Sequence, residues 1–225
     1  MAEEPVGAEQ GADERARAWS ALVATARRTV ADGLVVGTSG NVSVRIGDTV
    51  LVTPSGVPYD ELTPDDLVAV GLDGEQKAGT LTPTSELPMH LAVYRATPAR
   101  AVVHTHAVHA TAVSTLVPEL PLIHYMAAAL GGPVRVASYA TYGTERLAEN
   151  VLDALEERTG CLLQNHGTLT YGDTLAAAYD RTAQLEWLCR VWLTASAHPH
   201  HTPTLLTRDQ VREVEEKLRG YGQRG

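Results

Sequence analysis

A strand and a helix in immediate succession are predicted for residues 101–114, AVVHTHAVHATAVS. Residues 101–106 form a short apolar run that predicts a buried strand, and residues 109–116 predict a helix. Other strands and helices alternate on both sides of this stretch without a long linker. That alternation predicts a single α/β domain in which helices pack against a sheet.

The segments around this stretch extend the same pattern. Residues 42–46 and 50–53 predict two strands joined by a hairpin turn at Gly47-Asp48, so part of the sheet is expected to be antiparallel. Residues 1–12 are polar and predict a disordered tail, which leaves residues 13–225 as the domain. Further strands are predicted at residues 67–70, 134–138, 161–164 and 168–171, and further helices at residues 19–30, 85–95, 144–157, 174–197 and 207–218.

The composition disfavours several classes of function. The net charge is −9 and Lys and Arg form no cluster beyond short pairs, which argues against nucleic-acid binding. No apolar run approaches the ~20 residues of a membrane span, and the acidic N-terminus lacks the pattern of a signal peptide. We therefore expect no membrane partner and a cytoplasmic location. Cys161 and Cys189 lie among apolar residues and are expected to be buried free thiols.

Three histidines are candidates for a metal site. His104 and His106 are two residues apart at the end of a strand, so both side chains leave the same face. His166 lies at a turn between two strands, where Gly167 lets the backbone present the ring. Three imidazoles with an open position are typical of catalytic zinc, although manganese, cobalt and iron stay possible. Glu86, at the start of a helix, is the candidate carboxylate.

The remaining histidines are expected to be ordinary. His109 and His124 are interpreted as partly buried residues without a ligand. A second group, His198, His200 and His201, follows a helix end in a Pro-rich stretch and predicts a solvated loop.

Short segments of glycine and hydroxyl residues are a second feature. Each offers free N–H groups or hydroxyls without bulky side chains, and each by itself is typical of a turn. Several such loops converging on one point would hold a phosphate without much positive charge. The segments are Thr38-Ser39-Gly40-Asn41, Thr53-Pro54-Ser55-Gly56 and Thr84-Ser85.

Taken in order, these motifs resemble the class II aldolase/adducin superfamily. The matching segments are TSGNVS at residues 38–43, TPSG at 53–56, PTSE at 83–86, HTHA at 104–107 and HG at 166–167. Within the superfamily, residues 101–114, 123–128 and 139–144 resemble the branch of L-fuculose-1-phosphate aldolases. The resemblance implies a three-layer αβα sandwich with a central mixed, largely antiparallel sheet. It also implies a homotetramer with active sites at subunit interfaces.

The resemblance also assigns roles to individual residues. It implies a zinc-dependent aldolase that cleaves a ketose 1-phosphate to dihydroxyacetone phosphate and a short aldehyde such as L-lactaldehyde. Zinc is held by His104, His106 and His166 in this reading, and Glu86 is both a zinc ligand and the catalytic base. The proton donor is Tyr125 of a neighbouring subunit, and Tyr221 helps close the site. The phosphate is held by Asn41, Ser55, Gly56, Thr84 and Ser85.

Some positions depart from the pattern of the superfamily, and other activities stay open. Thr84 and Ser55 exchange one hydroxyl residue for another, whereas Gln164-Asn165 stands where a second histidine is common. Tyr142 replaces a Phe near the aldehyde end, so the aldehyde preference is open. Ribulose-phosphate 4-epimerases and methylthioribulose-phosphate dehydratases use the same metal site. An adducin-like interaction domain is disfavoured because this chain keeps all three histidines and Glu86.

Overall fold

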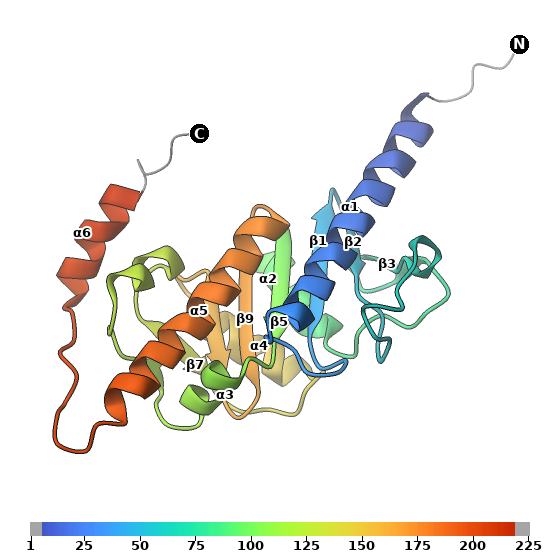
Figure 1. Ribbon diagram of the computed structural model, residues 1–225. Coiled ribbons are helices and arrows are strands. Elements are labelled where there is room, and N and C mark those ends of the chain that lie inside the picture. The colour runs from blue at the N-terminus through green and yellow to red at the C-terminus, as the bar shows by residue number, and fades with distance from the viewer. Residues whose placement is uncertain (1–5, 219–225) are drawn as a thin grey trace, which may run out of the picture.

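The fold is built on one mixed sheet. The computed structural model describes residues 6–218, with side chains from residue 13 onward. In that part of the chain nine strands form a sheet in the order β4-β3-β2-β1-β5-β9-β8-β7-β6 (Figure 1). The strands are β1 Asn41–Ile46, β2 Thr49–Val52, β3 Ala69–Gly71, β4 Gln76–Ala78, β5 Ala101–Thr105, β6 Glu119–Leu120, β7 Val134–Ala137, β8 Gly160–Leu163 and β9 Gly167–Gly172.

Most strand pairs are antiparallel. The predicted hairpin at Gly47-Asp48 joins β1 and β2, with Ile46 opposite Thr49. Strand β5 lies between β1 and β9 and is antiparallel to both, whereas β7 and β8 are parallel. The sheet is therefore mixed and largely antiparallel, as predicted.

Helices cover both faces of the sheet. Alternate residues of β5 divide between two cores: Val102 packs with α2 and α4, and Val103 packs with α1 and α5. Figure 1 shows α1, α3 and α5 crossing in front of the sheet, with α2 and α4 behind it. This three-layer arrangement confirms the predicted fold class. The helices are α1 Val6–Ala31, α2 Leu87–Ala96, α3 Val108–Ser114, α4 Glu145–Leu155 and α5 Leu175–Ser196.

The helix starts follow from capping residues. Thr144 and Thr174 accept hydrogen bonds from the backbone N–H groups of Leu147 and Ala177, three residues on. Thr63 begins the short 3-10 helix η1, Pro64–Asp66, with a reciprocal bond to Asp66. Each cap contributes about 1 kcal/mol because it satisfies an N–H group that has no partner within the helix.

The C-terminal helix α6, Arg208–Leu218, stands apart from the sheet (Figure 1). Its Val211 packs with Leu122, Ala127 and Ala128, in and before the 3-10 helix η2, Tyr125–Leu130. None of the helices within residues 6–218 is long and apolar enough to cross a membrane. Helix α1 begins at Val6, inside the range predicted as a tail, and residues 1–5 lie outside the described residues, so the tail boundary stays a prediction.

Candidate metal centre and its cavity

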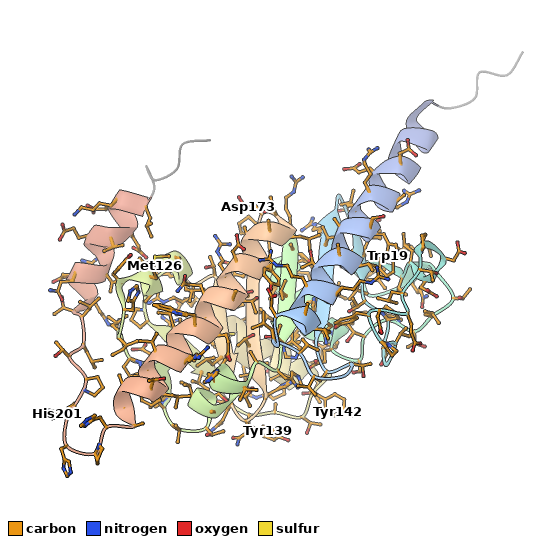
Figure 2. All side chains as sticks on the ribbon, in the orientation of Figure 1. Trp19, Met126, Tyr139, Tyr142, Asp173 and His201 are labelled. Atoms are coloured by element: carbon orange, nitrogen blue, oxygen red, sulfur yellow. The ribbon has the colours of Figure 1, made fainter. Side chains whose placement is uncertain are left out.

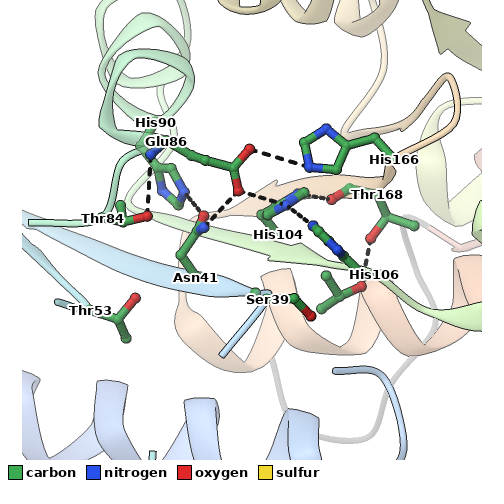
Figure 3. A network of polar contacts seen from close by, with 12 residues as sticks. Ser39, Asn41, Thr53, Thr84, Glu86, His90, His104, His106, His166 and Thr168 are labelled. Atoms are coloured by element: carbon green, nitrogen blue, oxygen red, sulfur yellow. Dashed lines mark hydrogen bonds and ion pairs between the residues drawn. The ribbon is translucent and has the colours of Figure 1, made fainter. Parts of the chain in front are cut away.

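The structure brings the three candidate histidines together. His104 is in β5 and His106 directly follows it, while the β5–β9 pairing sets Thr105 opposite Thr168 and so places the His166 turn beside them. The three ring centroids are 4.7–4.9 Å apart (Figure 3). Together with Glu86, each of these residues offers a ligand atom within 4.8 Å of all the others. The spacing therefore suits four ligands of one cation.

The turn that presents His166 works differently from the expectation. Asn165, not a glycine, adopts the left-handed backbone, with φ 56°. Asparagine tolerates this conformation better than most residues. Gly167 is needed for another reason, because a Cβ atom there would lie 2.1 Å from the backbone oxygen of Thr105. The glycine thus lets β9 approach β5 closely enough for His166 to reach His106.

Glu86 joins the cluster from the other side. It is the residue before α2, which begins at Leu87, so it lies one position outside the helix rather than in its first turn. Its Oε2 lies 3.0 Å from His104 Nε2, and its Oε1 lies 3.3 Å from His166 Nε2. Oε2 also accepts a hydrogen bond of 2.9 Å from the Asn41 side-chain amide. Oε1 is a buried atom that has no hydrogen-bond partner among residues 13–218.

The hydrogen bonds leave lone pairs facing the centre of the cluster. The Thr168 backbone oxygen can only accept, so His104 Nδ1 donates its N–H group to it at 2.7 Å, and Nε2 is the ring nitrogen that faces the cluster. Such a backbone partner is typical of histidines that bind metals. His104 Nε2 and Glu86 Oε2 then face each other at 3.0 Å, an arrangement that a shared cation or proton relieves. Together with the orphaned Oε1, these donors fit a divalent metal ion.

The electrostatics favour neutral rings at His106 and His166 and an ionised Glu86 carboxylate. Burial, reinforced by neighbouring His104, lowers the pKa of His106 to about 3 and that of His166 to about 4. Burial would raise the pKa of Glu86, but His104, His166 and the Asn41 hydrogen bond outweigh it and hold the pKa below its ordinary value. Neutral imidazole and ionised carboxylate are the protonation states that bind metals.

A cavity of about 340 Å³ adjoins the cluster. The glycine and hydroxyl segments of the sequence converge on it, because Ser55 N donates to Thr82 O and Thr84 N donates to Thr53 O, at 2.9 and 3.1 Å. All five candidate phosphate residues therefore line this cavity. They are Asn41, Ser55, Gly56, Thr84 and Ser85.

Aromatic residues form the rim of this cavity. Tyr139 and Tyr142 line it and remain 63% and 64% exposed. Figure 2 shows both residues at the lower edge of the molecule. Gly143 has a φ of 75°, and a Cβ atom there would lie 2.6 Å from the backbone oxygen of Ser85. This close approach holds the rim against the segment that carries Glu86.

Two candidate residues lie elsewhere. Tyr125 is in η2, 49% exposed, with its ring 4.3 Å from that of His124, which packs in turn on Trp187. It is not part of the cavity wall within the described chain, and Figure 2 shows the adjacent Met126 well apart from Tyr139 and Tyr142. Tyr221 lies outside the described residues.

The other histidines do not enter the cluster. His109 contacts Glu186, with Nδ1 2.6 Å from the carboxylate, and His198 and His201 lie near each other at an exposed turn. They match the ordinary roles that the sequence predicts for them.

Sequence reasoning missed three buried residues behind the cluster. His90 and Tyr94 of α2 and Ser43 of β1 form a hydrogen-bonded line that ends at Asn41. Burial, with a contribution from His104, lowers the pKa of His90 to about 3, so the ring is neutral. A signal was present, because Glu86, His90 and Tyr94 are four residues apart and so share one face of a helix.

Comparison with known proteins adds to this geometry. Residues 20–193 match the family model described as "Class II Aldolase and Adducin N-terminal domain". The chain is 44% identical to L-fuculose phosphate aldolase of Escherichia coli K12 over 194 residues, 85% of this chain and 89% of that one. It is 38% identical to 5-methylthioribulose-1-phosphate/5-deoxyribulose-1-phosphate aldolase of Rhodospirillum rubrum over 203 residues, 89% of this chain and 90% of that one.

Solved structures agree with these relatives. A structure of L-fuculose 1-phosphate aldolase superposes with a TM-score of 0.87 at 33% identity, covering 90% of this chain and 96% of the other. The L-fuculose-1-phosphate aldolase from Thermus thermophilus gives a TM-score of 0.74 at 35% identity, covering 84% of this chain and 100% of the other.

Proposed function

The chain belongs to the class II aldolase and adducin family, and is thus an aldehyde-lyase; we propose that it is a zinc-dependent aldolase acting on a ketose 1-phosphate. The proposed products are dihydroxyacetone phosphate and a short aldehyde such as L-lactaldehyde. One observation carries the proposal: Glu86 packs against three histidines at the end of a cavity that is lined by residues with hydroxyl groups.

The cavity wall supports binding of a phosphate. The chain has a net charge of −9, so a phosphate dianion has to be held by local donors rather than by the overall field. The hydroxyls of Ser55, Thr84 and Ser85, the Gly56 N–H and the second hydrogen of the Asn41 amide are such donors. Holding the phosphate at a fixed distance from the metal centre orients the reacting carbon, which is a main source of rate enhancement.

The cluster supports a metal-dependent reaction. His104, His106 and His166 would hold the ion together with Glu86, and zinc is the ion that this set of nitrogen and oxygen ligands suits best. A divalent ion held there acts as a Lewis acid that stabilises the negative charge developing on the ketose oxygens. Elemental analysis of the purified protein tests the identity of the metal.

Glu86 and Tyr125 are the proposed groups for proton transfer. In the direction of addition, Glu86 takes a proton from the carbon next to the ketone of dihydroxyacetone phosphate, which requires the ionised form that its neighbours maintain; in cleavage the same carboxyl group returns that proton to the carbon. Tyr125 takes the proton of the hydroxyl that becomes the aldehyde oxygen in cleavage and returns it in addition. Because Tyr125 lies away from its own cavity, we propose that it serves a neighbouring subunit of a homotetramer. Tyr221 is proposed to help close the site.

A panel of phosphorylated ketoses tests the reaction. Release of dihydroxyacetone phosphate from L-fuculose 1-phosphate is the expected result. The named activities of the relatives make 5-deoxyribulose and 5-methylthioribulose 1-phosphates the next substrates to try. Inversion of a ribulose phosphate without release of dihydroxyacetone phosphate would instead indicate an epimerase, and loss of water from the ketose a dehydratase.

Mixing two inactive variants tests the shared site. If each site takes Glu86 and Tyr125 from different subunits, co-expressed Glu86→Gln and Tyr125→Phe chains form about one intact site in four, given random assembly. Activity should therefore recover to about a quarter of the native level. Failure to recover any activity in tetramers shown to contain both chains would contradict the shared site.

A further inference from the structure

We propose that His90 is a positioning residue of this site: it fixes the side-chain amide of Asn41 and, through it, the Glu86 carboxylate. The inference rests on the proposed function, because the orientation of Glu86 matters for turnover only if this carboxylate moves a proton in an aldolase reaction.

The proposal starts from an unbroken line of buried hydrogen bonds. Tyr94 Oη lies 2.7 Å from Ser43 Oγ, which lies 2.7 Å from His90 Nδ1. His90 Nε2 lies 2.5 Å from Asn41 Oδ1, and Asn41 Nδ2 lies 2.9 Å from Glu86 Oε2 (Figure 3). All five side chains belong to residues that are at most 5% exposed, so water cannot replace a missing partner.

Each link in this line has one allowed direction. An ionised Glu86 can only accept, so the NH₂ group of Asn41 must face it and the amide oxygen must face His90. That oxygen also only accepts, so His90 carries its proton on Nε2 and leaves Nδ1 as an acceptor. Ser43 therefore donates to Nδ1 and accepts in turn from Tyr94. The hydrogen-bond network thus assigns the amide orientation and the histidine tautomer together.

This line excludes the alternative orientation of Asn41. Rotating the amide by half a turn would set its oxygen 2.9 Å from the Glu86 oxygen and its NH₂ group 2.5 Å from the N–H group of His90. Two attractive contacts would become two repulsive ones. With His90 in place, Glu86 Oε2 is held by Asn41, and Oε1 stays turned toward His166.

The alternative interpretation is that His90 only fills space between α2 and β1. Two substitutions at His90 distinguish this packing role from the proposed positioning role. His90→Leu fills most of the volume but has no donor for Asn41. His90→Gln keeps an N–H group close to the position of Nε2. Thr182→Val is a matched control, since Thr182 is fully buried and bonded to Thr170 at 2.6 Å, in the α5–β9 interface.

The experiment compares these variants as zinc-loaded full-length proteins, using the ketose phosphate that the native protein cleaves. Loss of one buried hydrogen bond predicts that kcat falls roughly tenfold in His90→Leu. We expect KM to rise by no more than about threefold, because Asn41 is one of five proposed phosphate residues and the other four are untouched, and His90→Gln to recover most of the lost kcat. Thr182→Val should lower the unfolding midpoint without this loss of kcat.

Cobalt(II) supplies a readout that is independent of turnover. Titrating metal-free protein with Co²⁺ reports the ligand arrangement through visible absorption, which should change in His90→Leu and return in His90→Gln. If the native protein cleaves none of the ketose phosphates, the proposed function fails, yet the cobalt spectra still test the positioning of Glu86.

Three outcomes would overturn the proposal. One is an unchanged kcat and cobalt spectrum in His90→Leu, and another is an equal loss in the Leu and Gln variants. If His90→Leu does not fold, Ser43→Ala replaces it, because without the Ser43 hydroxyl the His90 proton is free to move to Nδ1. A native kcat and spectrum in Ser43→Ala would be the third contrary outcome.

Discussion

Glu86→Gln is the substitution that most directly tests how the cluster works. The amide oxygen of Gln can keep the 2.9 Å hydrogen bond from Asn41. Its NH₂ group then takes the place of Oε1, 3.3 Å from His166 Nε2, and donates to the lone pair that His166 would give to a metal ion. A competing hydrogen bond of about 1.4 kcal/mol weakens metal affinity about tenfold.

The loss of the base is the larger effect. A neutral amide cannot take a proton, and removing a general base usually costs about 10²-fold or more in kcat, which is roughly 2.7 kcal/mol in the barrier. The assay is release of dihydroxyacetone phosphate at saturating zinc, with zinc content measured by elemental analysis. Glu61→Gln makes the same exchange at an exposed position and should behave as native protein. A kcat within about threefold of native, at full zinc occupancy, would refute the assignment of Glu86 as the base.

Three further predictions concern the metal site and the sheet. His104→Ala should lose most of its zinc whereas exposed His198→Ala keeps it, and equal zinc contents would contradict the ligand assignment. Gly167→Ala sets a Cβ atom 2.1 Å from Thr105 O and should lower the free energy of unfolding by about 3 kcal/mol in urea denaturation; a loss under ~1 kcal/mol would contradict this clash. For metal-free protein, the free energy of unfolding should fall as the pH drops from 6.5 to about 4. In this range His106 and His166, with pKa values lowered to about 3 and about 4 in the folded protein, take up protons only on unfolding. A free energy of unfolding that does not change with pH in urea denaturation would argue against the lowered pKa values.

Local signals in the sequence were enough for most elements of the fold. The alternation in β5 places Val102 and Val103 in different cores, and Thr144 and Thr174 begin the helices predicted for them. The strand order could not be predicted from local signals, because the pairing of β5 with β9 joins residues more than 60 positions apart and no local pattern encodes it. The class of sheet was anticipated from the resemblance to a family rather than from periodicity.

The candidate site was predictable to a similar depth. The spacing of His104 and His106 indicated a shared face, and the structure sets their Nε2 atoms 3.0 Å apart. The role of His90 was out of reach because it depends on β1 lying beneath α2, where Ser43 meets a histidine 47 positions away. The turn at His166 was assigned to Gly167 because glycine favours turns, whereas the tight approach of β9 to β5 is what requires it.

The order of the cluster along the chain has a consequence for biogenesis. Glu86, His104 and His106 are synthesised within 21 residues of one another, whereas His166 follows 60 residues after His106. An ion captured before that moment would have an incomplete ligand set and dissociate readily. A metal ion would therefore find its full ligand set only after β9 has docked on β5.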